Sequence, residues 1–159
     1  MNNLDLSNID ELPEHGWGLK ILFPITDELS YERTPDDRQN CLKLVKNYSA
    51  YPSQVSTDSS TPRQKIKLQV KSDIALLENV LAWYQQLEEQ PIPKSVWWQC
   101  QIALAEGFTN AVNHAHKNLP NTTPIELQIS VFDECLEIRI WDYGGPFDIE
   151  AEFNNSQQN

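Results

Sequence analysis

Residues 106–116 read EGFTNAVNHAH, and the rest of the fold is interpreted outward from this stretch. Glu106, Asn110 and His114 are spaced i, i+4 and i+8, so in a helix they form one polar stripe. The ordinary interpretation of such a stripe is a solvated helix side. A carboxylate can also act as a general base, and an amide oxygen one turn away can hold a hard cation such as Mg²⁺, as phosphoryl transfer requires. Both interpretations stay open from these residues alone.

A second polar stretch, DYGGPFD at 142–148, directly follows a strand expected at 135–141. Asp, Gly and Pro form turns in many proteins, and a turn is the ordinary interpretation. An Asp at a strand end can also accept a hydrogen bond from an amine, while the glycines let a flat ring approach the backbone. A third stretch, GWGL at 16–19, places glycines at the head of an expected helix, where free N–H groups can bind phosphate or a simple capping turn can form.

The apolar periodicity predicts the elements around these stretches. Alternation of apolar and polar residues indicates strands, and apolar residues every three or four positions indicate helices. Ser72 and Asp73 offer N-caps for the middle helix. The fold class expected from this pattern is an α/β sandwich, with three helices on one face of a mostly antiparallel mixed sheet of about five strands. The expected strands are 29–33, 41–46, 66–70, 125–132 and 135–141, and the expected helices are 19–25, 74–89 and 94–117.

Composition excludes several classes of function. The 159 residues suit one domain, and 12 Lys and Arg against 23 Asp and Glu give a net charge of −11, which would repel a nucleic-acid backbone. No apolar run approaches the length of a membrane helix, and residues 1–14 do not resemble a secretory signal, so we expect a cytoplasmic protein. Three cysteines without close spacing argue against a disulfide framework and against a zinc site.

Three segments lack the apolar residues of a packed core. Residues 1–13 and 150–159 are polar, and we expect both ends to be disordered. Residues 49–64 are rich in Ser, Thr and Pro, and we expect a linker there.

Together, the three motifs resemble those of the Bergerat-type ATP-binding fold, which is shared by sensor histidine kinases, type II topoisomerases, ninety-kilodalton heat-shock chaperones and anti-sigma factor serine kinases. The stretch 106–116 is similar to the asparagine box of that superfamily. The stretch 142–148 is similar to its adenine-binding motif, in the version of the anti-sigma kinases that ends in Pro-Phe-Asp. The stretch 16–19 is similar to its glycine motif beyond the ATP lid.

The resemblance implies an ATP- and Mg²⁺-dependent serine-protein kinase that phosphorylates an anti-sigma factor antagonist and sequesters a sigma factor. It also implies a homodimer or a segment-swapped dimer as the partner arrangement. The alternative is a non-catalytic nucleotide-binding module that binds a sigma factor or another regulator. A folded remnant that no longer binds ATP is a third possibility.

The resemblance also implies a role for each motif residue. Glu106 would be the general base and Asn110 would ligate Mg²⁺. Asp142 would accept from the adenine amine, and Gly144 would leave space for the ring. The other expected nucleotide-binding residues are Asn113, His114, Pro146, Gly16, Gly18 and Leu19.

The motifs stand in a different order from the family's, in which the glycine motif and a final hairpin follow the adenine motif. Here residues 1–48 carry them first, and moving these residues behind Asn159 restores the family order. We therefore expect one circularly permuted ATPase domain over 1–159. Its parts would be the glycine motif and hairpin at 1–48, the joining linker at 49–64, the body at 65–148, and a lid opened into 149–159 and 1–13. Two departures remain, because QNCL at 39–42 replaces a Gly-Thr-Thr-like segment and no arginine precedes Gly16.

Overall fold

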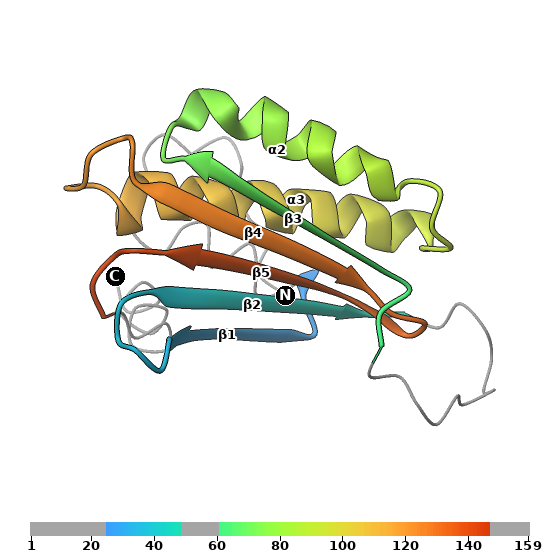
Figure 1. The fold of residues 1–159 in the computed structure, drawn as a ribbon. Helices are drawn as coiled ribbons and strands as arrows, with labels where there is room; N and C mark the ends of the chain where they lie inside the picture. The colour runs from blue at the N-terminus through green and yellow to red at the C-terminus, as the bar shows by residue number, and fades with distance from the viewer. Residues whose placement is uncertain (1–24, 49–60, 147–159) are drawn as a thin grey trace, which may run out of the picture.

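The chain forms a five-stranded sheet with helices packed on one face (Figure 1). The computed structural model describes residues 25–48 and 61–146. The strand order is β1-β2-β5-β4-β3, and every neighbouring pair is antiparallel. The strands are β1 (Glu28–Arg33), β2 (Asn40–Asn47), β3 (Gln64–Lys71), β4 (Pro124–Val131) and β5 (Cys135–Asp142). The prediction of five strands is confirmed, but the sheet is wholly antiparallel rather than mixed, because two helices in succession between β3 and β4 return the chain in the opposite direction.

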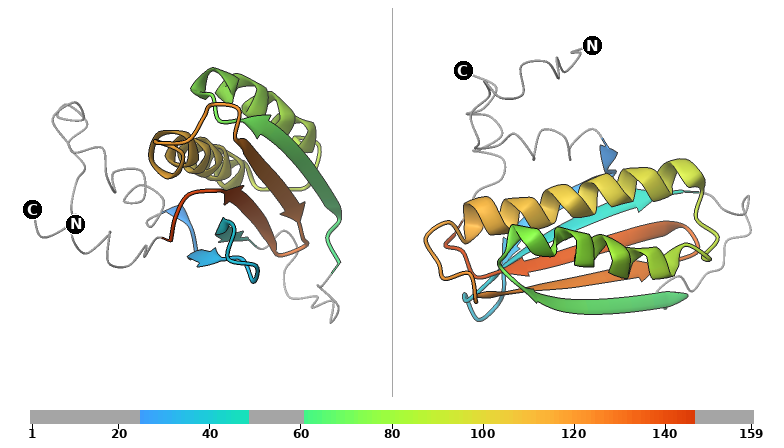
Figure 2. Two further views of the ribbon diagram at one scale, coloured as in Figure 1. Left: turned by 60° about the vertical axis from the view of Figure 1, so that its left-hand side comes forward. Right: turned by 90° about the horizontal axis from the view of Figure 1, so that it is seen from above.

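The alternation seen in the sequence produces the two faces of the sheet. Side chains of one face form the core with the helices, and most are at most 3% exposed. The core side chains of the three central strands are Leu42, Leu44, Ile125, Leu127, Ile129, Val131, Leu136, Ile138 and Ile140. The opposite face is polar, with Lys43, Gln128 and Arg139 in register across the sheet. Figure 2 shows both helices on the apolar face, as expected for a sheet covered on one side.

Two α-helices cover the sheet in the described residues, where three helices were expected. The first, α2 (Leu77–Tyr84), is flanked by 3₁₀ turns. The turn before it, Ile74–Leu76, is capped by the Asp73 carboxylate, which accepts from the Ala75 N–H at 3.0 Å. The second, α3 (Lys94–Asn110), continues as a π-helical segment, Ala111–Ala115, instead of the uniform helix expected to 117. The helix expected at 19–25 lies outside the described residues apart from Ile25.

Gly107 lets α3 lie directly on the sheet. A Cβ at this position would come within 2.6 Å of Ile140 Cδ1 and 3.3 Å of Leu42 Cδ2. The glycine therefore sets the distance between the helix and strands β2 and β5. Because Glu106 is its neighbour, this contact also fixes the height of Glu106 above the sheet.

The strands on either side of residues 49–60 end and begin at the same end of the sheet. The Tyr48 N–H donates to Glu134 O at 2.8 Å, and the Arg63 N–H donates to Val131 O at 2.7 Å, on the two sides of the β4–β5 turn. Strands β2 and β3 are three strand spacings apart, or about 14 Å. The linker was expected to extend to residue 64. It ends before that residue, because Gln64 already belongs to β3.

Within 25–48 and 61–146, no helix has the length and hydrophobicity needed to span a membrane.

Candidate functional site

A buried carboxylate lies at the end of the sheet where β5 passes into the loop 143–146. Asp142 is the last residue of β5 and is 2% exposed. Its Oδ1 accepts from Asn40 Nδ2 and from the Gly144 N–H, both at 2.9 Å, and its Oδ2 accepts a short hydrogen bond from the Tyr31 hydroxyl. Burial, followed by the Asp142 charge, raises the pKa of Tyr31, so this phenol stays protonated and donates. Three uncharged donors therefore stabilise the Asp142 carboxylate.

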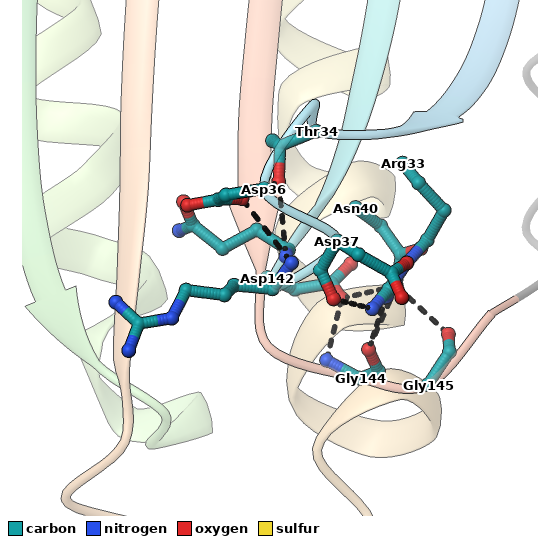
Figure 3. Close-up of polar contacts among 10 residues, drawn as sticks. Arg33, Thr34, Asp36, Asp37, Asn40, Asp142, Gly144 and Gly145 are labelled. Carbon is teal, nitrogen blue, oxygen red and sulfur yellow. Dashed lines mark hydrogen bonds and ion pairs between the residues drawn. The ribbon is translucent and has the colours of Figure 1, made fainter.

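The β1–β2 hairpin holds the loop that follows Asp142 (Figure 3). Asn40 Nδ2 lies 3.2 Å from Gly144 O and 3.0 Å from Gly145 O. One guanidinium nitrogen of Arg33 donates to Gly144 O at 2.8 Å and to Asn40 Oδ1 at 3.2 Å. The same guanidinium is fixed by the Asp37 carboxylate at 2.9 Å. Residues more than 100 positions apart in sequence thus build one site.

The π-helical end of α3 forms the opposite wall of this loop. A Cβ on Gly144 would lie 2.9 Å from Ala115 O, whereas a Cβ on Gly145 would meet nothing within 4 Å. The Tyr143 N–H donates to His116 Nε2 at 2.8 Å. The π turn aims Ala115 and His116 at the loop, because the His116 N–H bonds to Ala111 O, five residues back.

His116 is held in its neutral form. It is 3% exposed, and burial lowers its pKa although the nearby Asp142 charge opposes this shift. Since Nε2 accepts from Tyr143, the ring proton belongs on Nδ1. In the described part of the chain, that buried Nδ1 has no hydrogen-bond partner.

Glu106 and Asn110 lie on one side of α3. Both are half-buried, and burial raises the pKa of Glu106. The buried Nδ2 of Asn110 has no partner among the described residues. Gln99 and Ala103 precede them at helical spacing and line one shallow crevice together with Ile25, so this side of α3 faces Ile25.

Only some of the remaining predicted site residues lie in the described part of the chain. Asn113 and His114 lie in the π-helical segment, Asn113 exposed and His114 half-buried. Of the expected i, i+4, i+8 stripe, Glu106 and Asn110 lie in α3, whereas His114 follows in the π-helical segment. Pro146 is exposed at the end of the described loop, and Gly16, Gly18 and Leu19 lie outside the described residues.

Sequence comparison assigns the chain that carries this site to a family. Residues 70–159, more than half of the chain, match the family described as the histidine kinase-like ATPase domain. The chain belongs to this family. The matched residues include Glu106, Asn110 and Asp142, whereas Tyr31, Arg33 and Asn40 lie outside them.

Individual relatives of this histidine kinase-like ATPase match a shorter region. The serine-protein kinase RsbW of Bacillus licheniformis is 44% identical over 50 residues, which are 31% of this chain and 31% of that protein. The serine-protein kinase RsbW of Staphylococcus epidermidis is 43% identical over 51 residues, 32% of each chain. The matched region thus spans about a third of the length of these curated relatives. No solved structure matches the chain.

The residues of this ATPase domain fit a nucleotide better than a resident metal ion. Among the described residues, no group of three or more His, Cys, Asp and Glu could hold a cation. Mg²⁺ commonly takes few protein ligands and completes its shell with phosphates and water. The unpartnered atom of Asn110 is its amide nitrogen, a donor that suits a phosphate oxygen or a water. The amide would have to turn over to offer its oxygen to Mg²⁺.

Sequence reasoning missed several residues of the site. Asn40 was noted as a departure from the family pattern, without the role that its contact with Asp142 gives it. Leu29, Tyr31 and Arg33 alternate along β1, which could have placed Tyr31 and Arg33 on the face of Leu42 and Asn40. His116 was quoted within the asparagine box, but its bond to Tyr143 depends on the π turn.

Packing gives Gly144 a structural reason to be a glycine, and its expected role beside the ring stays a prediction. Ala115 occupies the space beside Gly144, whereas a Cβ on Gly145 would meet nothing within 4 Å. We expect Gly144→Ala to lower the free energy of unfolding by about 1–3 kcal/mol, because a backbone oxygen must move away from the new methyl group.

Gly145→Ala is the matched control and should change stability by less than about 1 kcal/mol, because its Cβ enters open space. Urea unfolding of the two variants measures the difference. Equal destabilisation of both would show that the Gly144–Ala115 contact is not what requires a glycine.

Proposed function

We propose that this chain binds Mg²⁺-ATP and transfers the γ-phosphate to a serine of an anti-sigma factor antagonist, and that it sequesters a sigma factor. The observation that carries the proposal is the buried Asp142 carboxylate, which the end of α3 and the β1–β2 hairpin enclose in a chain of the histidine kinase-like ATPase family. The names of the partly matching relatives support the serine-kinase activity.

Each part of the site has a chemical task in this proposal. Asp142 accepts from the adenine amine, and the open side of Gly145 admits the ring. Glu106 takes the proton of the attacking serine hydroxyl, for which a carboxylate with a raised pKa is suited. Asn110 contacts the phosphates or Mg²⁺. The cation, when bound, neutralises charge on the phosphates.

The expected glycine motif precedes Ile25, the first described residue, by six to nine positions in the sequence. Ile25 lies beside Gln99 and Ala103 of α3, and Glu106 is seven residues further along that helix. Gly16, Gly18 and Leu19 would offer backbone donors to the phosphates, with Asn113, His114 and Pro146 at the margin of the site.

We also propose that the segment order is circularly permuted relative to the family. The hydrogen bonds of Tyr48 and Arg63 on both sides of the β4–β5 turn support this, because residues 49–62 need to bridge only about 14 Å. A lid divided between residues 149–159 and 1–13 has more freedom to lose when it closes over ATP. A chain relinked between Asn159 and Met1, and opened within 49–60, should therefore bind ATP more tightly. Equal dissociation constants would contradict the divided lid.

Incubation with Mg²⁺, γ-labelled ATP and a candidate antagonist protein tests the function. A kinase transfers label to the antagonist, whereas the alternative, a non-catalytic nucleotide-binding module, is stabilised by Mg²⁺-ATP in a thermal shift without transferring label. A protein that shows neither effect does not have the proposed function. Light scattering of the same samples tests the proposed dimer.

A further inference from the structure

The hydrogen bond between Tyr143 and His116 joins the loop 143–146 to the end of α3. The Tyr143 N–H donates to His116 Nε2 at 2.8 Å, and His116 is 3% exposed. The π turn fixes the backbone of His116, because its N–H bonds to Ala111 O. The first residue of the loop is therefore held by a buried side chain, and loss of this acceptor would leave the Tyr143 N–H without its partner.

This hydrogen bond requires a neutral imidazole. Nε2 accepts only while it carries no proton, and the neutral ring then has its proton on Nδ1. A second proton can bind only at Nε2, where it would face the Tyr143 N–H. Protonation of the ring and breaking of this hydrogen bond are therefore one event.

Three elements place charged or titratable groups near this ring. Strand β5 contributes Asp142, whose negative charge favours the protonated ring, but burial has the larger effect and lowers the pKa of His116 from its ordinary value of 6.5. The loop contributes the Tyr143 phenol, and the helix end contributes His114 and Lys117. The acceptor at Nε2 is therefore intact above pH 6.5 and is lost as the pH falls through the lowered pKa.

The hairpin holds the same loop through groups that keep their charge state in this range. Asn40 donates to Gly144 O and Gly145 O as a neutral amide. Arg33 donates to Gly144 O as a guanidinium, which stays charged in proteins. Among the described hydrogen bonds of the loop to the hairpin and to the helix end, the bond to His116 is thus the one that a proton can break between about pH 5 and 8.

We propose that His116 is a positioning residue, which holds the loop 143–146 while its imidazole is neutral and releases the loop when Nε2 takes a proton from the solvent. The effect on nucleotide binding rests on the proposed function, which places the nucleotide at this loop, whereas release of the loop does not. ATP should bind most tightly above pH 6.5 and more weakly in acid. The loss is limited to about tenfold, which corresponds to one buried hydrogen bond.

Two variants at position 116 separate the hydrogen bond from the charge. His116→Gln offers an amide oxygen that can accept from the Tyr143 N–H and cannot take a proton, whereas His116→Phe offers no acceptor. At about pH 7.5 the glutamine variant should bind ATP like the wild type, and the phenylalanine variant about tenfold more weakly. Toward about pH 5 the wild type should approach the phenylalanine variant, while the glutamine variant stays about tenfold tighter than that variant.

Calorimetric titration of the full chain with Mg²⁺-ATP at each pH measures these dissociation constants. Titration of the nucleotide and of Glu106 affects all the proteins alike, so the ratio of the wild-type constant to that of His116→Gln isolates the imidazole. His114→Gln is the control for the other histidine of this segment. Whatever its affinity at neutral pH, that affinity should fall in acid by the same factor as in the wild type.

Release of the loop can be measured without nucleotide. In NMR spectra of the wild type, the imidazole nitrogens of His116 and the amide of Tyr143 should shift with one common midpoint below pH 6.5. In His116→Gln the imidazole signals disappear and the Tyr143 amide should lose this transition. The melting temperature of the wild type should also fall relative to that of His116→Gln in this range, because the unfolded chain takes up a proton that the folded ring excludes.

A Tyr143 amide that does not follow the protonation of His116 would overturn the inference. A phenylalanine variant that equals the wild type in melting temperature and ATP affinity at neutral pH would also overturn it. A ratio of wild-type to glutamine-variant constants that is independent of pH would overturn it and leave the proposed function intact. A wild type that binds no ATP at any pH would instead overturn the proposed function, and a common NMR midpoint would still support release of the loop.

Discussion

Glu106→Gln is expected to lower the rate of phosphoryl transfer to the antagonist by about 10²- to 10⁴-fold, the usual contribution of a general base. Glutamine preserves the shape of the side chain but cannot take the serine proton. Because burial raises the pKa of Glu106, the wild-type carboxylate is a stronger base than an exposed one. ATP binding should change little, since the proposed base contacts neither the purine nor its amine.

Single-turnover transfer from labelled ATP measures the rate, and titration measures ATP affinity in the same variant. Glu126→Gln is the matched control, because Glu126 is also half-buried but lies on the polar face of the sheet, opposite Trp141. The control should transfer phosphate at the wild-type rate. A Glu106→Gln variant that phosphorylates as fast as the wild type would exclude this base, and one that also loses ATP binding would indicate a structural role.

Asn40→Leu is expected to produce the largest loss of stability, about 2–4 kcal/mol. Asn40 is 1% exposed and its amide serves Asp142, Gly144 O and Gly145 O. Leucine fills a similar volume but offers no donor, so a buried charge and two carbonyls lose a partner. Arg33 loses the amide oxygen that it contacts.

Urea unfolding measures this effect, with Asn47→Leu as the control. Asn47 lies in the same strand but is exposed at the far end of the sheet, and its replacement should change stability by less than about 0.5 kcal/mol. ATP binding by Asn40→Leu should also weaken, because the β1–β2 hairpin no longer holds the loop 143–146 through the Asn40 amide. Equal stabilities of the two variants would show that the buried contacts of Asn40 contribute nothing net.

The sheet could be read from the sequence because its evidence is local. Each strand alternates apolar and polar residues, and the turn at 133–134 separates two strands that pair with each other. Asp73 was recognised as a cap for the same reason, since its partner Ala75 is two residues away. Glu106, Asn110 and Asp142 could be singled out by residue type and spacing, and the roles that the family resemblance implies for them stay predictions.

The contacts that complete the site could not be read in this way. Asn40 and Asp142 are 102 residues apart, and only the register of β2 on β5 makes them partners. The π turn at 111–115 brought His116 to Tyr143, although residues 94–117 suggest an uninterrupted helix. The packing contact that requires a glycine at position 144 could not be predicted from the sequence either, because it is made by Ala115, which belongs to another element.

The sequence by itself determined the five strands, the cap of the middle helix and the family to which the asparagine and adenine motifs point. Tertiary structure alone decided which neutral donors surround Asp142 and which glycine faces open space. The physical reason is the distance along the sequence over which each interaction acts. Periodicity and capping act within a few residues, whereas the environment of a buried charge is set by strands that sheet pairing brings together from opposite parts of the chain.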